Sequence, residues 1–140
     1  MYNAMDIANW MITYANEHDI VNMSNLVLQK LLYLAQVFYL NKHKKPLFHD
    51  TIVAWDFGPV VEEVYMTYKR HGACMIPRAE DYMELDKETS KDIASVLEHF
   101  KDWSCTDLTK LVHNQDPWCD AYYNNTRVIT NESILKYFCM

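Results

Sequence analysis

Cysteine and histidine are the side chains of this sequence with the most evident chemical potential, and it has four of the first and six of the second. Thiolates and imidazoles bind zinc, and together they also form nucleophile–base pairs. The spacing that suits a metal is His71-x-x-Cys74, which His113 and Cys119 could join. Structural zinc sites normally contain two such close pairs, whereas this sequence has one. We therefore expect no metal ligands.

Catalysis by other side chains receives little support from the motifs. The sequence has no G-x-S-x-G turn, and its two glycines are too few for a phosphate-binding loop. The neighbouring carboxylates Glu62 and Glu63 would point about 100° apart on a helix, which does not suit a shared acid–base role. A cysteine–histidine dyad stays open as an alternative, because such partners meet in space. We expect a protein that is not an enzyme, with no catalytic or cofactor-binding residues and no cofactor.

The composition favours one helical domain. The length of 140 residues suits a single domain, half of the residues are hydrophobic, and only two glycines and four prolines are available for turns. The formal net charge of −6 makes nucleic acid an unlikely partner, since its phosphates would be repelled. The basic run at residues 42–45 is short and reads as a solvated helix end.

Nothing in the sequence indicates a membrane or an export pathway. The longest apolar stretch, residues 31–40, is interrupted by Gln36 and is too short to span a bilayer. The N-terminus carries Asp6 early and lacks the pattern of a signal peptide. The cysteines form no C-x-x-C pair, so we expect reduced thiols and a cytoplasmic protein.

The apolar periodicity places a helix at residues 4–17 and a second at residues 25–41, with Asn3 and Ser24 as N-caps. The second helix is apolar around most of its circumference, so it should lie at the centre of the domain. Its polar residues form one narrow stripe, which we expect to be exposed at Gln29 and Tyr33. The members of the stripe are Asn25, Gln29, Tyr33 and Gln36.

Lys30 lies away from this stripe. A lysine on an otherwise apolar helix either extends its amine to solvent or pairs with an acid. The candidate acids are Asp56, Glu62 and Glu63.

A strand–turn–helix corner follows. Residues 51–55 and 127–130 have the β-branched character of short strands, and we expect them to pair as one two-stranded ribbon. Gly58 is placed to form a turn, and Pro59 to open a helix that ends before Gly72. Residues 73–85 read as a loop, whose order the sequence leaves undecided.

Four further helices follow from caps and apolar stripes. The N-caps that we expect for them are Asp86 or Thr89, Ser104, Asp116 (followed by Pro117) and Asn131. The predicted fold is therefore mainly α, a single compact helical domain of six or seven helices around a buried central helix.

Aromatic side chains at the corner are the candidates for contact with a partner, since tryptophan and tyrosine anchor many interfaces. Trp55 is the best of them, because a loop leaves one of its sides open. The alternative is that Gly58, Pro59 and Tyr65 only hold the fold. The candidate partner-binding residues are Gln29, Tyr33, Trp55, Phe57, Gly58, Pro59 and Tyr65.

Three motifs resemble the Panacea domain, the family of SocA-like antitoxins and GepA-like phage-associated proteins. They are LQKLLYLAQ at residues 28–36, KPLF at residues 45–48, and AW-x-x-GPVV-x-x-VY at residues 54–65. The resemblance continues through Leu108-x-x-Leu111-Val112-His113 and Pro117-Trp118, so we expect residues 1–140 to form one Panacea-like domain. Many members carry an additional terminal segment, and we expect none here.

The resemblance implies a helical antitoxin that binds and neutralises a cognate protein toxin by direct contact. One branch of the family implies a ClpXP-type protease as a further partner. The alternative function is therefore a phage- or prophage-borne adaptor or anti-defence protein, which delivers a target to a host protease or blocks an immune effector.

Overall fold

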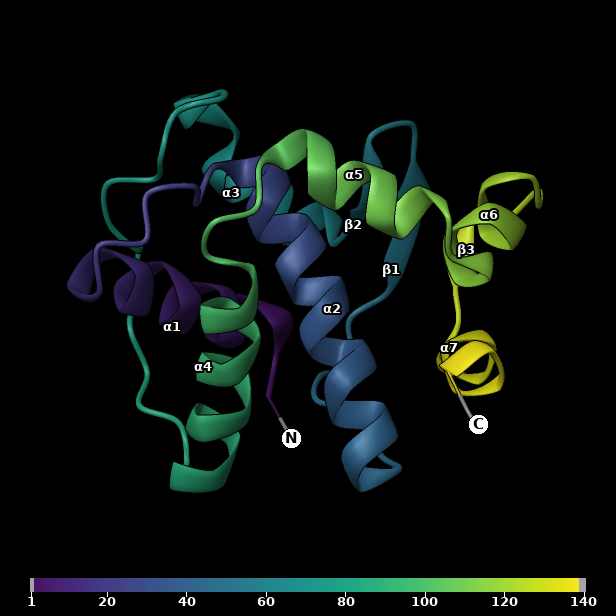
Figure 1. Cartoon of the computed structure of the whole chain (residues 1–140), viewed down its shortest axis with the longest axis horizontal. Helices are drawn as coiled ribbons and strands as arrows, with labels where there is room; N and C mark the ends of the chain where they lie inside the picture. Colours follow the sequence, from purple (N-terminus) through teal and green to yellow (C-terminus); the bar gives the residue numbers. More distant parts are fainter. Residues whose placement is uncertain (1, 139–140) are drawn as a thin grey trace.

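The structure is a computed structural model that describes residues 2–138, and most of these residues lie in helices. Within this range the chain forms seven α-helices, one 3-10 helix and a three-stranded sheet, which confirms the mainly α prediction (Figure 1). The elements are α1 (Ala4–Glu17), α2 (Asn25–His43), β1 (Ile52–Trp55), β2 (Gly58–Val60), α3 (Glu62–Tyr68), the 3-10 helix η1 (Lys69–His71), α4 (Lys87–Phe100), α5 (Cys105–His113), α6 (Asp116–Tyr122), β3 (Val128–Ile129) and α7 (Asn131–Phe138).

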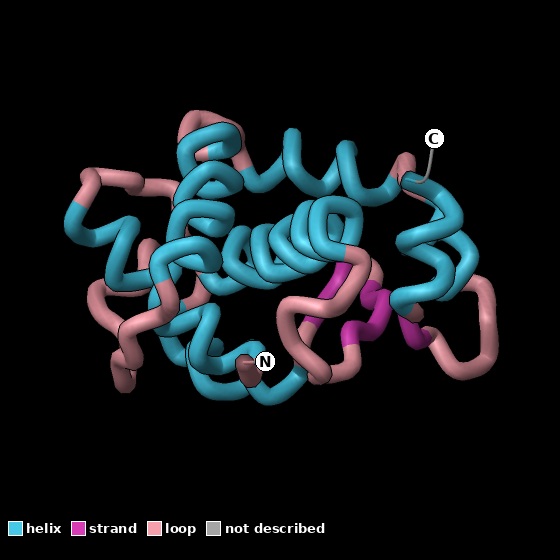
Figure 2. Tube along the Cα trace, turned by 90° about the horizontal axis from the view of Figure 1, so that it is seen from below, coloured by secondary structure: helices cyan, strands magenta, loops and turns pink. Residues whose placement is uncertain are grey.

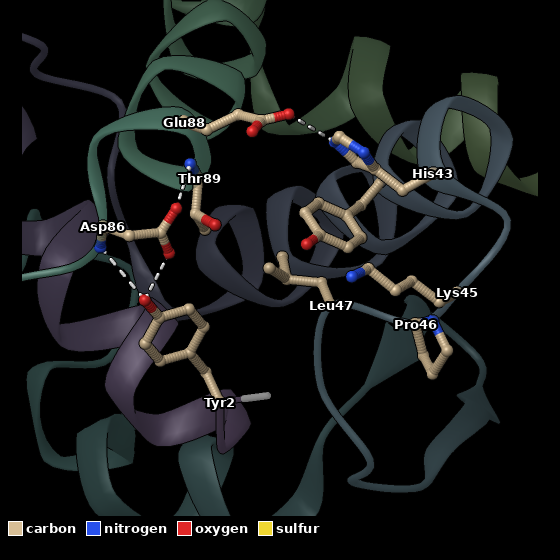
Figure 3. Close-up of a pocket in the computed structure, with 9 residues that line it drawn as sticks. Tyr2, His43, Lys45, Pro46, Leu47, Asp86, Glu88 and Thr89 are labelled. Atoms are coloured by element: carbon tan, nitrogen blue, oxygen red, sulfur yellow. Dashed lines mark hydrogen bonds and ion pairs between the residues drawn. The ribbon is translucent and has the colours of Figure 1, made fainter.

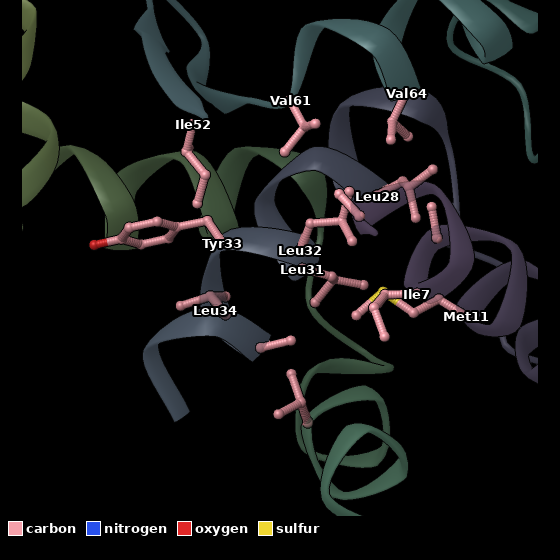
Figure 4. Close-up of a cluster of buried hydrophobic side chains, with 14 of the residues drawn as sticks. Ile7, Met11, Leu28, Leu31, Leu32, Tyr33, Leu34, Ile52, Val61 and Val64 are labelled. Atoms are coloured by element: carbon pink, nitrogen blue, oxygen red, sulfur yellow. The ribbon is translucent and has the colours of Figure 1, made fainter. Parts of the chain in front are cut away.

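Helix α2 lies at the centre, as predicted. Thirteen of its 19 residues are buried, and it packs against α1, α3, α4, α5, α7 and β2. Figure 2, which looks nearly along α2, shows the other helices and the sheet around it. The core combines aliphatic side chains of α1, α2, β1 and α3, including Met11, Leu28 and Val64 (Figure 4). None of the helices in residues 2–138 has the length and apolar character needed to cross a membrane.

Most helix starts lie where the caps predicted them. The Ser24 hydroxyl accepts a hydrogen bond from the backbone N–H of Val27, and the Asp86 carboxylate accepts one from Thr89. Ser104 caps α5 in the same way. The last two starts differ from the prediction. Asp116 is already the first residue of α6 and therefore does not cap it. The N-cap position is occupied by Gln115, whose side chain makes no capping hydrogen bond. At α7 the hydroxyl of Thr130 accepts from the N–H of Ser133, so Asn131 is not the cap.

The sheet contains the predicted pair of strands and a third strand that the sequence did not reveal. Its order is β2-β1-β3, and both pairings are antiparallel. The prediction that a helix begins at Pro59 was wrong. Pro59 belongs to β2 and pairs with Ala54, and α3 begins at Glu62. Proline is tolerated here because β2 is an edge strand, which leaves one side without ladder hydrogen bonds.

The loop between η1 and α4 is tied to the rest of the molecule. Ile76 is fully buried, and its N–H donates to the carbonyl of Met23. Asn16 donates to the carbonyl of Pro77, and the Tyr68 hydroxyl accepts from the N–H of Glu80. These contacts give residues 73–85 a defined path.

Candidate partner-binding site

The polar stripe of α2 faces the interior, so the expectation that Gln29 and Tyr33 are exposed was wrong. Gln29 is 1% exposed and Tyr33 is 0% exposed. Asn25 and Gln36 are buried as well. A polar stripe on a helix can therefore be covered, provided that each buried group finds a hydrogen-bond partner.

Gln29 joins α2 to the start of α3. Its Oε1 accepts a hydrogen bond of 2.9 Å from the backbone N–H of Val61, the N-cap residue of α3. Its Nε2 donates to Oδ1 of Asn25 at 3.1 Å, and Nδ2 of Asn25 donates to the carbonyl of Tyr65 at 3.0 Å. The two carboxamides thus hold the start and the middle of the short helix α3.

Tyr33 and Gln36 make similar connections further along α2. The Tyr33 hydroxyl donates to Oε1 of Gln115 at 2.7 Å, and burial raises the pKa of this phenol. Figure 4 shows its hydroxyl pointing away from the aliphatic cluster. The carboxamide of Gln36 accepts from the N–H of Leu47 at 2.9 Å and donates to the carbonyl of Phe48 at 3.0 Å. The stripe is therefore a framework inside the fold and offers no surface to a partner.

Lys30 is buried without an acid, which contradicts both the predicted ion pair and the predicted extension to solvent. It is 1% exposed, and no carboxylate of the described residues forms an ion pair with it. Its Nζ donates to the carbonyl of Leu26 at 3.5 Å, a long contact one turn back on the same helix. Burial lowers the pKa of Lys30, and the nearby Cys105 opposes this shift.

Gly58 lies directly against the Lys30 side chain. A Cβ atom at Gly58 would be 3.3 Å from Cε of Lys30 and 3.5 Å from its Nζ. The φ of Gly58 is +129°, a backbone conformation that side chains oppose. Gly58 and Pro59 are both buried, which supports the alternative that they hold the fold.

Trp55, Phe57 and Tyr65 form a surface cluster, here called the aromatic corner. The Trp55 ring makes edge contacts with Phe57 and Tyr65, at centroid distances of 6.0 and 5.0 Å. Phe57 is 41% exposed, while Trp55 and Tyr65 are half-buried. The carbonyl of Trp55 accepts a hydrogen bond of 3.0 Å from Nε1 of Trp118, so α6 fixes the base of the corner.

Two further residues complete this surface. Tyr122 donates a hydrogen bond to Asp56, and the Arg127 guanidinium lies 4.6 Å from the centre of the Tyr122 ring. Arg127 also borders a hollow of about 250 Å³ with Trp55, Asp56 and Phe57. Sequence reasoning did not select Tyr122 and Arg127 as site residues, because their proximity to the corner depends on the β1–β3 pairing.

The cysteine–histidine alternative finds little support in the geometry. The Cys119 thiol donates to the backbone carbonyl of His113 at 2.9 Å, not to its imidazole. Burial raises the pKa of the Cys119 thiol and lowers the pKa of His113. Both shifts keep the pair neutral, which disfavours an activated thiolate.

The fold and this surface define a mainly helical domain with a partly exposed aromatic cluster at a β-hairpin. The family described as "Antitoxin SocA-like, Panacea domain" matches residues 28–119. This match covers more than half of the chain, which therefore belongs to the SocA-like Panacea family and confirms the predicted resemblance.

A curated relative is similar over a large part of the chain. Antitoxin SocA of Caulobacter vibrioides (strain NA1000 / CB15N) is 36% identical over 95 residues. The matched region covers 68% of this chain and 46% of the relative, so the chain spans about half the length of that protein. No solved structure matches.

Proposed function

We propose that this protein is an antitoxin-type protein that binds a cognate protein toxin and neutralises it by direct contact. The observation that carries the proposal is the 36% identity to antitoxin SocA, together with a family match that begins in α2 and ends in α6. The proposed action is stoichiometric binding without catalysis, and it requires no cofactor.

The proposed contact surface is the aromatic corner. The buried positions of Gln29, Tyr33, Gly58 and Pro59 assign these motif residues to the framework. Trp55 and Tyr65 belong to the motif at residues 54–65, Phe57 occupies one of its unspecified positions, and all three reach the surface. Aromatic side chains at interfaces contribute large contact areas for little loss of conformational entropy.

The charge near the corner favours a basic partner. Asp56 lies in the hairpin turn, and Glu62 and Glu63 begin α3; all three are exposed. The whole chain carries a formal charge of −6. Opposite charge on a partner would increase the rate of association and help to orient the two proteins.

Co-expression tests the proposed function. The tagged protein is isolated from its native host, and the gene of any stoichiometric partner is expressed with and without this chain. We expect the partner alone to arrest growth and this chain to restore it. A captured partner that is harmless when expressed alone would contradict an antitoxin role.

The same experiment addresses the adaptor alternative. Direct neutralisation should restore growth equally in cells that lack ClpXP, and the partner should accumulate as a complex. Loss of the partner only when the protease is present would instead indicate delivery for degradation.

A further inference from the structure

A second cluster of chemically capable side chains lies where the end of α2 meets the first turns of α4. His43 is the last residue of α2, and Glu88 and Asp92 are four positions apart on α4. Residues four apart share one face of a helix. Figure 3 shows the side chains of His43 and Glu88 pointing toward one another across the gap between the two helices.

The three side chains are close enough to share one ion. Nε2 of His43 is 2.8 Å from Oδ2 of Asp92 and 3.8 Å from Oε1 of Glu88. One ligand atom from each residue lies within 4.8 Å of the others. Ligands about 2.0–2.2 Å from a tetrahedral zinc ion are about 3.3 Å apart, so small side-chain movements would produce this arrangement.

We propose that His43, Glu88 and Asp92 form a binding site for a divalent transition-metal ion, with Zn²⁺ as the best match. One imidazole and two carboxylates are the ligand types of many zinc sites, and three protein ligands leave a fourth position for water. The sequence alone led us to expect no metal ligands, because its one suitable spacing, His71-x-x-Cys74, lacks a second pair. Nothing in it suggests combining residues that are 45 and 49 positions apart.

Burial distinguishes this cluster from ordinary surface acids. Asp92 is 4% exposed although it is charged, and the imidazole of His43 packs against Tyr39 at a centroid distance of 4.3 Å. Glu88 is exposed and provides the side from which an ion could enter. Beside it, a hollow of about 350 Å³ lined by Tyr2, Tyr39 and Lys45 among others gives room for a bound water (Figure 3).

Lys42 occupies the other side of Asp92. Its Nζ lies 2.6 Å from Oδ1, whereas His43 faces Oδ2. The lysine side chain is half exposed, so its ammonium could remain on Oδ1 or turn to solvent when an ion binds. The ion would link α2 to α4, a role that is independent of the proposed toxin contact.

Metal titration of the chelator-treated, full-length protein tests the proposal, with Zn²⁺ followed by calorimetry and Co²⁺ by absorption. We expect one site per chain and a cobalt spectrum without thiolate charge transfer, because no cysteine takes part. Glu88→Gln should weaken binding by at least about tenfold. His43→Gln should do the same. The exposed His99→Gln on α4 is the matched control and should bind as the wild type does.

Lys42→Met provides a second readout, since it removes a cation that competes for Asp92 and should leave Zn²⁺ binding equal or stronger. The proposal is overturned if Glu88→Gln binds Zn²⁺ with unchanged affinity, if cobalt shows thiolate ligation, or if neither ion binds. Circular dichroism of each variant establishes that the fold is retained.

Discussion

The carboxamide of Gln29 shows how a single side chain can fix the start of another helix. It accepts the hydrogen bond of the Val61 N–H, a donor at the N-terminus of α3 that the helix itself does not pair. Gln29→Ala would leave this buried donor unsatisfied and should lower the free energy of unfolding by about 1–3 kcal/mol. Urea denaturation measures the loss, with the exposed Asn114→Ala as control. Unchanged stability would contradict the framework role.

For Lys30 we predict the opposite effect, because its buried amine forms no ion pair with any acid among residues 2–138. Lys30→Met keeps the aliphatic contacts with Gly58 and removes the charge, so it should increase stability at neutral pH. A loss of stability at neutral pH would show that the charge is favourable in the fold.

The difference in stability between Lys30→Met and the wild type should depend on pH, and its direction follows from the pKa of Lys30. Burial lowers the pKa of Lys30 in the folded protein below its ordinary 10.5, so the unfolded chain binds the proton more tightly. The penalty is complete below the folded-state pKa and decreases as the pH rises toward 10.5. The advantage of Lys30→Met over the wild type should therefore shrink on the alkaline side, as measured by urea denaturation of both proteins across this range.

At the scale of elements, the start of α4 is joined to the N-terminal segment by one carboxylate. Asp86 accepts a hydrogen bond of 2.5 Å from the Tyr2 hydroxyl and another from the Thr89 N–H. These bonds lower the pKa of Asp86 from 3.8 to about 2. Its contribution to stability is thus present above pH 3.8 and is lost as the pH falls toward 2.

Asp86→Asn should consequently be less stable than the wild type at neutral pH, and the two proteins should converge near pH 2. Chemical denaturation at several acid pH values measures the difference. Asp102→Asn, at an exposed position after α4, should show no such convergence. If the free energies of unfolding of Asp86→Asn and the wild type differed by the same amount from neutral pH to about pH 2, the stabilising role of the ionised Asp86 would be contradicted.

The local signals along the sequence predicted the elements better than the contacts between them. Ser24 and Asp86 could be assigned as caps because their partners lie three residues away. Pro59 was misplaced because proline suits both the first turn of a helix and an edge strand, and only the pairing with Ala54 distinguishes them. Tyr33 was placed on the surface because its partner Gln115 is 82 residues away. Periodicity defines the faces of a helix but not what covers them.

At the scale of the whole molecule, the family motifs divide into an interior and a surface part. Gln29 and Lys30 of α2 and Gly58 of the β1–β2 hairpin are buried, whereas Phe57, which precedes Gly58 in that hairpin, is exposed. Phe57→Ala should therefore retain the fold and weaken toxin binding by about 2 kcal/mol, or about thirtyfold in Kd. Met83→Ala is the matched control, because Met83 is 40% exposed and Phe57 is 41% exposed. Calorimetry with the purified partner measures both affinities.

Toxin binding through the aromatic corner is tested most directly by capture from the native host with three tagged proteins in parallel. These are the wild type, Phe57→Ala and Met83→Ala, and mass spectrometry identifies what each retains. We expect one stoichiometric protein, toxic when expressed alone, to be retained by the wild type and Met83→Ala and lost from Phe57→Ala. Equal retention of that toxin by all three proteins would contradict the assignment of the corner, and the absence of any toxic partner would contradict the antitoxin function itself.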